Sequence, residues 1–321
     1  MPSIKAQASV SGRSLPEQSR RHLSDRAIQN LFIWPTLILL IAMNVFPLLY
    51  SLYLGFTDYS AIANKPPVWV ALGNFGNILT SERLWKYFAT TGRYAFMSVG
   101  LQTVIGFGLA MLLRRKFFGS GLITTLILVP MMISPVVVGL FWKLIYNPTF
   151  GFFNFVLGAG DPAKGLEMLA SRFAGQPMSG LALFAVVIVD VWMWSPFVML
   201  LVLSGLNAIP DYLYEAAVID RASSWFQFWR ITLPQVAPLL LIAVLFRTIE
   251  AFKSFDLVMG MTGGGPGDQT ELIAVNLYRQ AFLGRFQTGQ ASALAYIILV
   301  IIVAVSNLYI KYLNQMKGEE A

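Results

Sequence analysis

The sequence predicts an all-α polytopic membrane protein with six transmembrane helices. Of its 321 residues, 56% are hydrophobic and only 12% are charged, which is about half the charged share of a soluble domain. Several apolar runs reach the ~20 residues that a helix needs to cross ~30 Å of hydrocarbon. The net charge of +7 suits a membrane protein with basic residues at the cytoplasmic ends of its helices.

The spans and tails follow from the order of apolar and polar stretches. A polar tail, residues 1–27, opens the chain and a short tail, residues 314–321, closes it. The predicted spans cover residues 31–55, 87–113, 122–145, 181–206, 236–259 and 291–313. Residues 28–86 hold the first span and an outer interfacial segment. Residues 87–313 form a core of spans two to six, which includes a polar loop at 207–235.

Proline and glycine mark two special places in this core. Pro130 and Pro135 lie inside the third span, where neighbouring helices can satisfy the carbonyl groups that a proline frees. Residues 262–267 contain four glycines and a proline. So many flexible residues cannot hold a helix, so this segment predicts a turn after the fifth span.

The distribution of lysine and arginine predicts the orientation. With both termini inside, the two tails, the polar loop and the Arg114-Arg115-Lys116 run hold about twelve of these residues, whereas the outer segments hold about seven. Basic residues are enriched on the cytoplasmic side of membrane proteins. We therefore expect both termini and the polar loop in the cytoplasm.

The composition also argues against several kinds of site. The chain has no cysteine and His22 is its only histidine, so disulfides, metal centres and histidine-based triads are not expected. It has no Gly-x-x-x-x-Gly-Lys-Ser/Thr motif for a nucleotide and no basic stripe with interleaved aromatics for a nucleic acid. A polytopic membrane enzyme, such as a glycosyl or acyl transferase, is therefore a weak alternative.

The polar loop predicts two short helices at the membrane surface. Pro210 suits the first helical position, and Glu215 suits the positive N-terminal end of the first helix. Ser224, with Gln227 three residues later, predicts a capping box for the second helix, and Pro234 is expected to end that helix. The second helix is rich in aromatic residues, which favour packing on the chain's own membrane domain or on a partner.

This loop resembles the cytoplasmic signature of permease subunits of binding-protein-dependent ABC importers. The matching positions are Glu215, Ala216, Ala217, Asp220, Ala222, Phe228, Ile231, Leu233 and Pro234. Arg221 stands where the family usually has glycine. If the turn needs a positive φ, a non-glycine residue there destabilises the fold by about 1 kcal/mol or more. The resemblance implies the type I ABC importer transmembrane fold. It also implies a cytoplasmic coupling helix that contacts the ATPase through Glu215, Ala216, Ala217, Asp220, Arg221 and Ala222.

Segments outside the loop resemble the sugar-importing branch of the same family. They are Phe255-Asp256, residues 262–266 and residues 278–282. The resemblance implies a carbohydrate permease subunit of the maltose or glycerol-phosphate type in a bacterial plasma (inner) membrane. It also implies three kinds of partner: a second permease subunit, two ATPase subunits that bind ATP and magnesium, and a periplasmic or lipid-anchored solute-binding protein. No cofactor is implied for this chain.

Several charges fall inside the predicted spans, where each costs several kcal/mol without a partner. Span five carries Arg247, Glu250, Lys253 and Asp256, and span four carries Asp190. Alternating signs at a spacing of three favour a self-neutralising ladder along one helix. A pair between Asp190 and Arg247 and a direct role in substrate binding are the alternatives.

A sugar needs polar groups for its hydroxyls and an aromatic face for its ring. The candidate substrate pathway is therefore Asp190, Trp194, Arg247, Glu250 and Lys253. Gln102 and Asn44 are weaker candidates, because a buried amide more often holds helices together. Acidic groups at mid-membrane also suit an ion-coupled secondary sugar transporter, although the polar loop and the absence of visible inverted halves argue against this alternative.

Overall fold

The structure is a computed structural model that describes most of the chain. The described residues are 25–63, 65–115, 117–157, 166–167, 169, 172–173, 176–177, 180–284 and 286–318. Most of the predicted N-terminal tail and the last three residues therefore lie outside the described part. The chain falls into two compact units, Met1–Tyr50 and Ser51–Ala321.

Helices make up nearly all of the described structure. In chain order, the elements are α1 (Asp25–Gly55), α2 (Gly73–Thr80), α3 (Glu82–Leu113), α4 (Ser120–Leu128), η1 (Val129–Met132), α5 (Pro135–Ile145), α6 (Phe152–Leu157), β1 (Leu166–Glu167), β2 (Arg172–Phe173), β3 (Gln176–Pro177), α7 (Leu181–Ala208), α8 (Tyr212–Ile219), α9 (Ser224–Gln227), η3 (Phe228–Thr232), α10 (Leu233–Phe252), α11 (Asp256–Met261), α12 (Ile273–Phe282) and α13 (Thr288–Gly318). The three two-residue strands form a small antiparallel sheet.

Five of the described helical stretches are long and apolar enough to cross a membrane. They are Gln29–Gly55, Glu82–Leu113, Leu181–Ala208, Ser224–Phe252 and Thr288–Met316. The all-α membrane fold is confirmed, and the last stretch extends into the predicted C-terminal tail. The third predicted span, residues 122–145, is present as apolar sequence, but it is not a single helix.

The third predicted span is broken at its prolines. α4 ends at Leu128, a 3₁₀ turn follows with Pro130 near its start, and α5 begins at Pro135. Ser134 has φ −59° and ψ 134°, because the ring of a following proline disfavours the helical region. The prediction that both prolines lie inside a continuous helix is therefore wrong. The break turns α5 toward α11, and Gly139 lies so close to it that a Cβ there would come within 2.8 Å of the Leu257 carbonyl oxygen.

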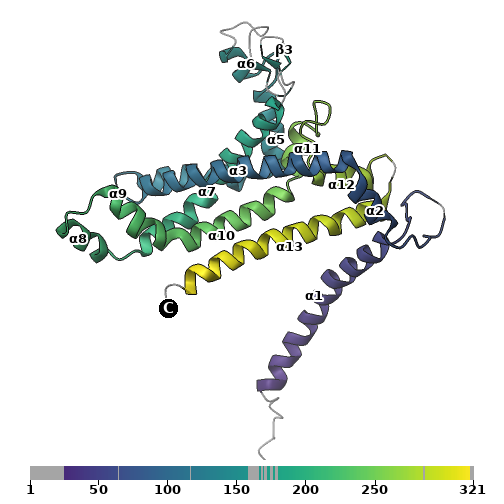
Figure 1. Ribbon diagram of the computed structural model, residues 1–321, viewed down its shortest axis with the longest axis horizontal. Coiled ribbons are helices and arrows are strands. Elements are labelled where there is room, and N and C mark those ends of the chain that lie inside the picture. The colour runs from purple at the N-terminus through teal and green to yellow at the C-terminus, as the bar shows by residue number, and fades with distance from the viewer. Residues whose placement is uncertain are drawn as a thin grey trace, which may run out of the picture. The chain divides into compact units, whose positions relative to one another are not determined.

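α7 is the central helix of the larger unit. It contacts α3 and α10, and α10 contacts α13 in turn, so that these four helices run alongside one another (Figure 1). The buried face of α7 is rich in valine and methionine, which contribute to two clusters of the hydrophobic core. Gly106 of α3 sits against this helix, since a Cβ at that position would come within 2.7 Å of the Val198 Cβ.

The glycine-rich turn after α11 is present as predicted. Gly263, Gly264 and Gly267 all have positive φ. Arg279 of α12 pairs with the buried Glu271 and donates to the Gly263 carbonyl oxygen, which fixes the turn to α12. Lys86 Nζ donates to Asp268 at 2.9 Å, and this hydrogen bond lowers the pKa of the Asp268 carboxyl.

Candidate functional site

The turn between α8 and α9 reverses the chain within the polar loop. Asp220 caps α8, and Arg221 follows with φ +52°. The Arg221 N–H donates to the Val218 carbonyl at 3.0 Å and the Ala222 N–H donates to the Ala217 carbonyl at 2.8 Å. This is the Schellman pattern, in which the residue at the position of Arg221 is usually glycine. The turn therefore needs a positive φ, and arginine occupies it at a cost of about 1 kcal/mol.

The second helix of the loop differs from its prediction at both ends. Ser223, not Ser224, is the cap, since its Oγ accepts from the Phe226 N–H at 3.2 Å. Pro234 does not end the helix, which runs on to Phe252. The five residues Phe228–Thr232 form a π-helical turn, and the Leu233 N–H donates to the Phe228 carbonyl five residues earlier. This wider turn accommodates the missing N–H and the bulk of the proline ring.

Most residues predicted to couple with an ATPase are exposed. Glu215, Ala216, Asp220 and Arg221 are exposed, Ala222 is half-buried, and Ala217 is buried. Around them lie large apolar side chains that the rest of the chain does not cover, namely Tyr212, Val218, Ile219, Trp225, Phe226 and Trp229. We call these six residues the apolar face of the loop. An exposed patch of this kind commonly marks a protein interface.

The inner side of the loop packs on the membrane helices. The ring of Phe228 meets that of Phe107 of α3 edge-on, with 5.8 Å between centroids. The hydroxyl of Tyr214 lies 2.9 Å from that of Thr232. Packing on the chain's own membrane domain is therefore observed for Phe228, whereas packing of the exposed aromatic residues on a partner stays a prediction.

A buried ion pair joins α7 to α10 in the middle of the bundle. An Arg247 guanidinium nitrogen lies 3.3 Å from the Asp190 carboxylate, and each side chain is only 4% exposed. Gln102 of α3 completes the group, because its Nε2 donates to Asp190 Oδ2 at 2.8 Å and its Oε1 accepts from Arg247 Nε at 2.9 Å. The predicted pair is confirmed, and the amide that seemed a weaker candidate binds both charges.

The predicted ladder along one helix is only partly correct. Glu250 and Lys253 do pair, at 2.8 Å, but Arg247 pairs across to α7 instead. α10 ends at Phe252 and Asp256 begins α11, so the four charges do not share one helix. The fifth predicted span is thus interrupted at residues 253–255, where the chain bends.

One small pocket brings the predicted pathway residues together. We call it the charged pocket; its volume is about 100 Å³ and its lining is Pro135, Asp190, Trp194, Arg247, Glu250, Lys253, Ser254, Phe255, Asp256 and Leu257. The ring of Trp194 lies 4.6 Å from the Arg247 Cζ. Glu250 and Lys253 are more than half exposed, whereas Asp190 and Arg247 lie beneath them. The volume holds roughly three waters at ~30 Å³ each, so the pocket must widen to admit a sugar.

The sequence did not single out the rest of this lining as a site. Pro135 comes from the start of α5, and Ser254 and Leu257 come from the break between α10 and α11 and from α11. Both groups lie at a break in a membrane-spanning segment. Such a break is tolerated where it lines a cavity, so a break predicted from the sequence could have located these residues. Asn44, in contrast, donates to the Leu40 carbonyl of its own helix at 2.8 Å.

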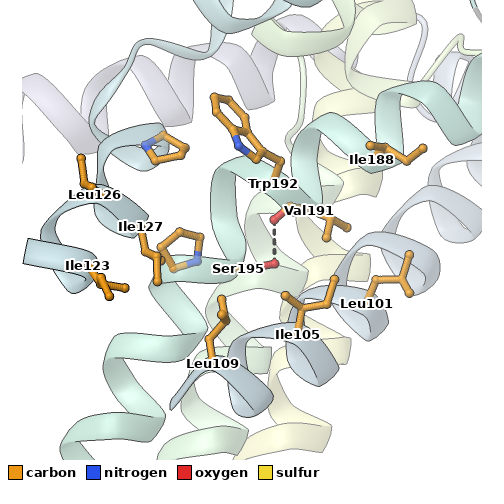
Figure 2. A pocket seen from close by; sticks show the side chains of 12 residues that line it. Leu101, Ile105, Leu109, Ile123, Leu126, Ile127, Ile188, Val191, Trp192 and Ser195 are labelled. Carbon is orange, nitrogen blue, oxygen red and sulfur yellow. Dashed lines mark hydrogen bonds between the residues drawn. The ribbon is translucent and has the colours of Figure 1, made fainter. Parts of the chain in front are cut away.

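A larger groove lies elsewhere and has different chemistry. The apolar groove measures about 670 Å³ and is lined by Leu101, Ile105, Leu109, Ile123, Leu126, Ile127, Pro130, Ile188, Val191, Trp192, Ser195 and Pro196. Figure 2 shows aliphatic side chains from several helices around it. Its one hydroxyl, on Ser195, donates to the Val191 carbonyl at 2.6 Å. The groove is lined almost entirely by apolar side chains and carries no charge, so the smaller charged pocket is the better candidate for a polar solute.

The described residues offer no metal site of three or more His, Cys, Asp or Glu side chains. The polar loop and the charged pocket remain the two candidate sites, one for a protein partner and one for a small polar molecule. They lie at different heights on the same helices, since α10 runs from the loop to the pocket. A movement of the loop can therefore reach the pocket through α10.

Comparison with known proteins identifies the family of the chain. Residues 102–316 match the family described as binding-protein-dependent transport system inner membrane component. The trehalose/maltose transport system permease protein MalF of Thermococcus litoralis is 34% identical over 88% of this chain and 92% of its own length. The probable starch degradation products transport system permease protein AmyD of Thermoanaerobacterium thermosulfurigenes is 31% identical over 90% of this chain and 94% of its own length.

A solved structure shows the same fold. A bacterial ABC transporter involved in the import of the acidic polysaccharide alginate matches with a TM-score of 0.72 and 18% identity, over 88% of this chain and 96% of that one. The family match covers two thirds of the sequence, and the Thermococcus litoralis relative covers nearly all of it. The chain therefore belongs to the binding-protein-dependent transport inner-membrane components, the permease subunits of ABC importers.

Proposed function

We propose that this chain is a permease subunit that passes a carbohydrate across the inner membrane in an ATP-driven importer. The main support for a carbohydrate substrate is the 34% identity, over 88% of the chain, to a permease named for trehalose and maltose. The charged pocket supports it, because carboxylates and a tryptophan face suit a sugar. Family membership leaves an ion-coupled secondary transporter without support.

Within the charged pocket, the exposed and buried charges have different tasks. Glu250 and Lys253 reach the pocket with more than half of each side chain exposed, so they form hydrogen bonds to sugar hydroxyls. Trp194 offers its ring to the apolar face of a sugar. Asp190 and Arg247 are already paired and bound by Gln102, so they hold the pocket walls in place beneath the sugar.

The polar loop couples this pocket to ATP hydrolysis. Glu215, Ala216, Ala217, Asp220, Arg221 and Ala222 form the contact with an ATPase subunit, together with the apolar face of the loop. The uncovered area supports this role, since Ile219 is 80% and Trp225 is 71% exposed. ATP and magnesium are bound by that partner, because this sequence has no P-loop motif.

The remaining partners follow from the orientation that the basic residues predict. Both termini and the polar loop face the cytoplasm, so the glycine-rich turn and the segment between α5 and α7 face outward, where a solute-binding protein docks. A second permease subunit pairs with residues 87–313 to enclose the pathway, and two ATPase subunits complete the importer. A solved bacterial alginate ABC transporter, in complex with an alginate pentasaccharide-bound periplasmic protein, shares this fold and supports the proposed arrangement.

The test is to purify the tagged chain together with the products of neighbouring genes and to measure ATP hydrolysis. The assay adds the solute-binding protein with each of a panel of sugars, including trehalose and maltose. One sugar is expected to stimulate hydrolysis, and that sugar identifies the substrate. Stimulation by an amino acid or peptide, and by no sugar, would contradict the carbohydrate proposal.

A further inference from the structure

A second polar pocket lies where the end of α3 meets the polar loop. It measures about 320 Å³, and its lining is Met111, Arg114, Arg115, Tyr214, Ser224, Gln227, Phe228 and Thr232. We call it the arginine pocket. None of these residues lines the charged pocket, and none is among those proposed to couple with the ATPase. The pocket is therefore a separate feature of the molecule.

The arginine pocket carries an unbalanced positive charge. Its lining has two guanidinium groups and no carboxylate. In the part of the chain that the structure describes, the ion pairs join other residues, and neither Arg114 nor Arg115 is within ion-pair distance of an acidic side chain. The pair therefore attracts an anion.

The ring of Tyr214 fixes the position of Arg114, and no hydrogen bond joins the Arg114 guanidinium to another described residue. Its guanidinium carbon lies 4.3 Å from the centre of the Tyr214 ring, and the hydroxyl of Tyr214 lies 2.9 Å from that of Thr232. Stacking uses the flat face of the guanidinium and leaves the N–H groups at its edge available. An edge of this kind binds two oxygens of a phosphate at once.

The arginine pocket is expected to lie at the level of the lipid headgroups. α3 has 32 residues and is about 48 Å long at 1.5 Å per residue, so it extends beyond the ~30 Å hydrocarbon layer. Just after the two arginines, Phe117 and Phe118 are exposed, the latter completely. Aromatic side chains favour the membrane–water interface. A ligand with a charged end and an apolar body fits this combination better than a small soluble anion.

We propose that the arginine pocket binds the phosphate of an anionic phospholipid. Arg114 donates from the edge of its stacked guanidinium, Arg115 adds the second charge, and the Ser224 hydroxyl offers a further donor. Phe117 and Phe118 lie beside the acyl chains. Because the lining comes from both α3 and the loop, a bound lipid joins the loop to the membrane domain.

The experiment is a lipid titration of the full chain, purified in detergent with the subunits that it retains and followed by native mass spectrometry. The probes are phosphatidylglycerol, zwitterionic phosphatidylcholine and inorganic phosphate. We expect the first tight binding event to favour phosphatidylglycerol over phosphatidylcholine by at least tenfold. Arg114→Gln with Arg115→Gln is expected to remove this preference, and millimolar inorganic phosphate is not expected to compete.

A matched control removes the same charge elsewhere. Arg230 and Lys311 are exposed and do not line the pocket, so Arg230→Gln with Lys311→Gln should keep the tenfold preference. If both double variants lost the preference for phosphatidylglycerol equally, the effect would be one of general charge and the proposal would be overturned. Full competition by inorganic phosphate would show a soluble-anion site instead. A wild-type chain without any preference would also overturn it and would favour a partner carboxylate in the pocket.

Discussion

At the scale of residues, the Asp190–Arg247 pair shows how a charge is tolerated inside this bundle. Each side chain is 4% exposed, so little of either charge is accessible to bulk water. Gln102 binds both partners and Trp194 covers the guanidinium. Breaking such a pair is costly because one charge is left buried, whereas replacing both partners with apolar groups is often tolerated.

This pair gives a double-mutant prediction. Asp190→Leu alone and Arg247→Met alone are each expected to destabilise the chain by about 3 kcal/mol, which should lower Tm in detergent by several degrees. Asp190→Leu combined with Arg247→Met is expected to recover most of that loss, because no charge remains buried. Additive losses in the double variant would show that the two side chains do not interact.

Arg221 carries a second residue-scale prediction. Since its φ is +52°, Arg221→Gly is expected to relieve strain and stabilise the loop by about 1 kcal/mol. Arg230→Gly is the matched control, because residue 230 lies inside the π-helical turn, where glycine should destabilise by about 1 kcal/mol. Thermal unfolding of both variants gives the comparison. A destabilised Arg221→Gly variant would mean that the arginine makes a contact that outweighs its strain.

At the scale of elements, the helices break where they form the charged pocket. The third apolar segment breaks before Pro135 and the fifth breaks after Phe252, and residues from both breaks line the pocket. Backbone groups freed by a break need polar surroundings inside a membrane. The pocket and the breaks are therefore one feature, and α11 and α5 pack closely beside it.

The contact between α3 and α7 leads to a prediction for glycine. At Gly106 a methyl group would come within 2.7 Å of the Val198 Cβ and 2.8 Å of the Ser195 carbonyl oxygen, so Gly106→Ala is expected to cost about 1–3 kcal/mol by forcing the helices apart. Gly100 on the same helix has open space around it. Gly100→Ala should be neutral or stabilising by up to about 1 kcal/mol. If both variants had the same Tm, close packing at Gly106 would be excluded.

At the scale of the whole molecule, composition and the length of the apolar runs predicted the all-α membrane fold, and the nine matching positions of the polar loop predicted the family. These signals are local, so a sequence shows them directly. The cap at Ser223 and the continuation of the helix past Pro234 could not be predicted, because the π-helical turn depends on how Phe228 packs against Phe107 of α3. The link from Gln102 to Asp190 and Arg247 was equally hidden, since it joins residues up to 145 positions apart.

The central claim is that the polar loop drives carbohydrate uptake at the expense of ATP. The most direct test is uptake of a labelled sugar by vesicles that contain the complete importer, with ATP on the side of the loop and binding protein on the other. Wild-type vesicles are expected to accumulate sugar only with ATP. Glu215→Lys is expected to abolish uptake and stimulated hydrolysis without lowering Tm, because Glu215 is exposed. Uptake under an ion gradient without ATP, or normal uptake by the Glu215→Lys importer, would contradict the account.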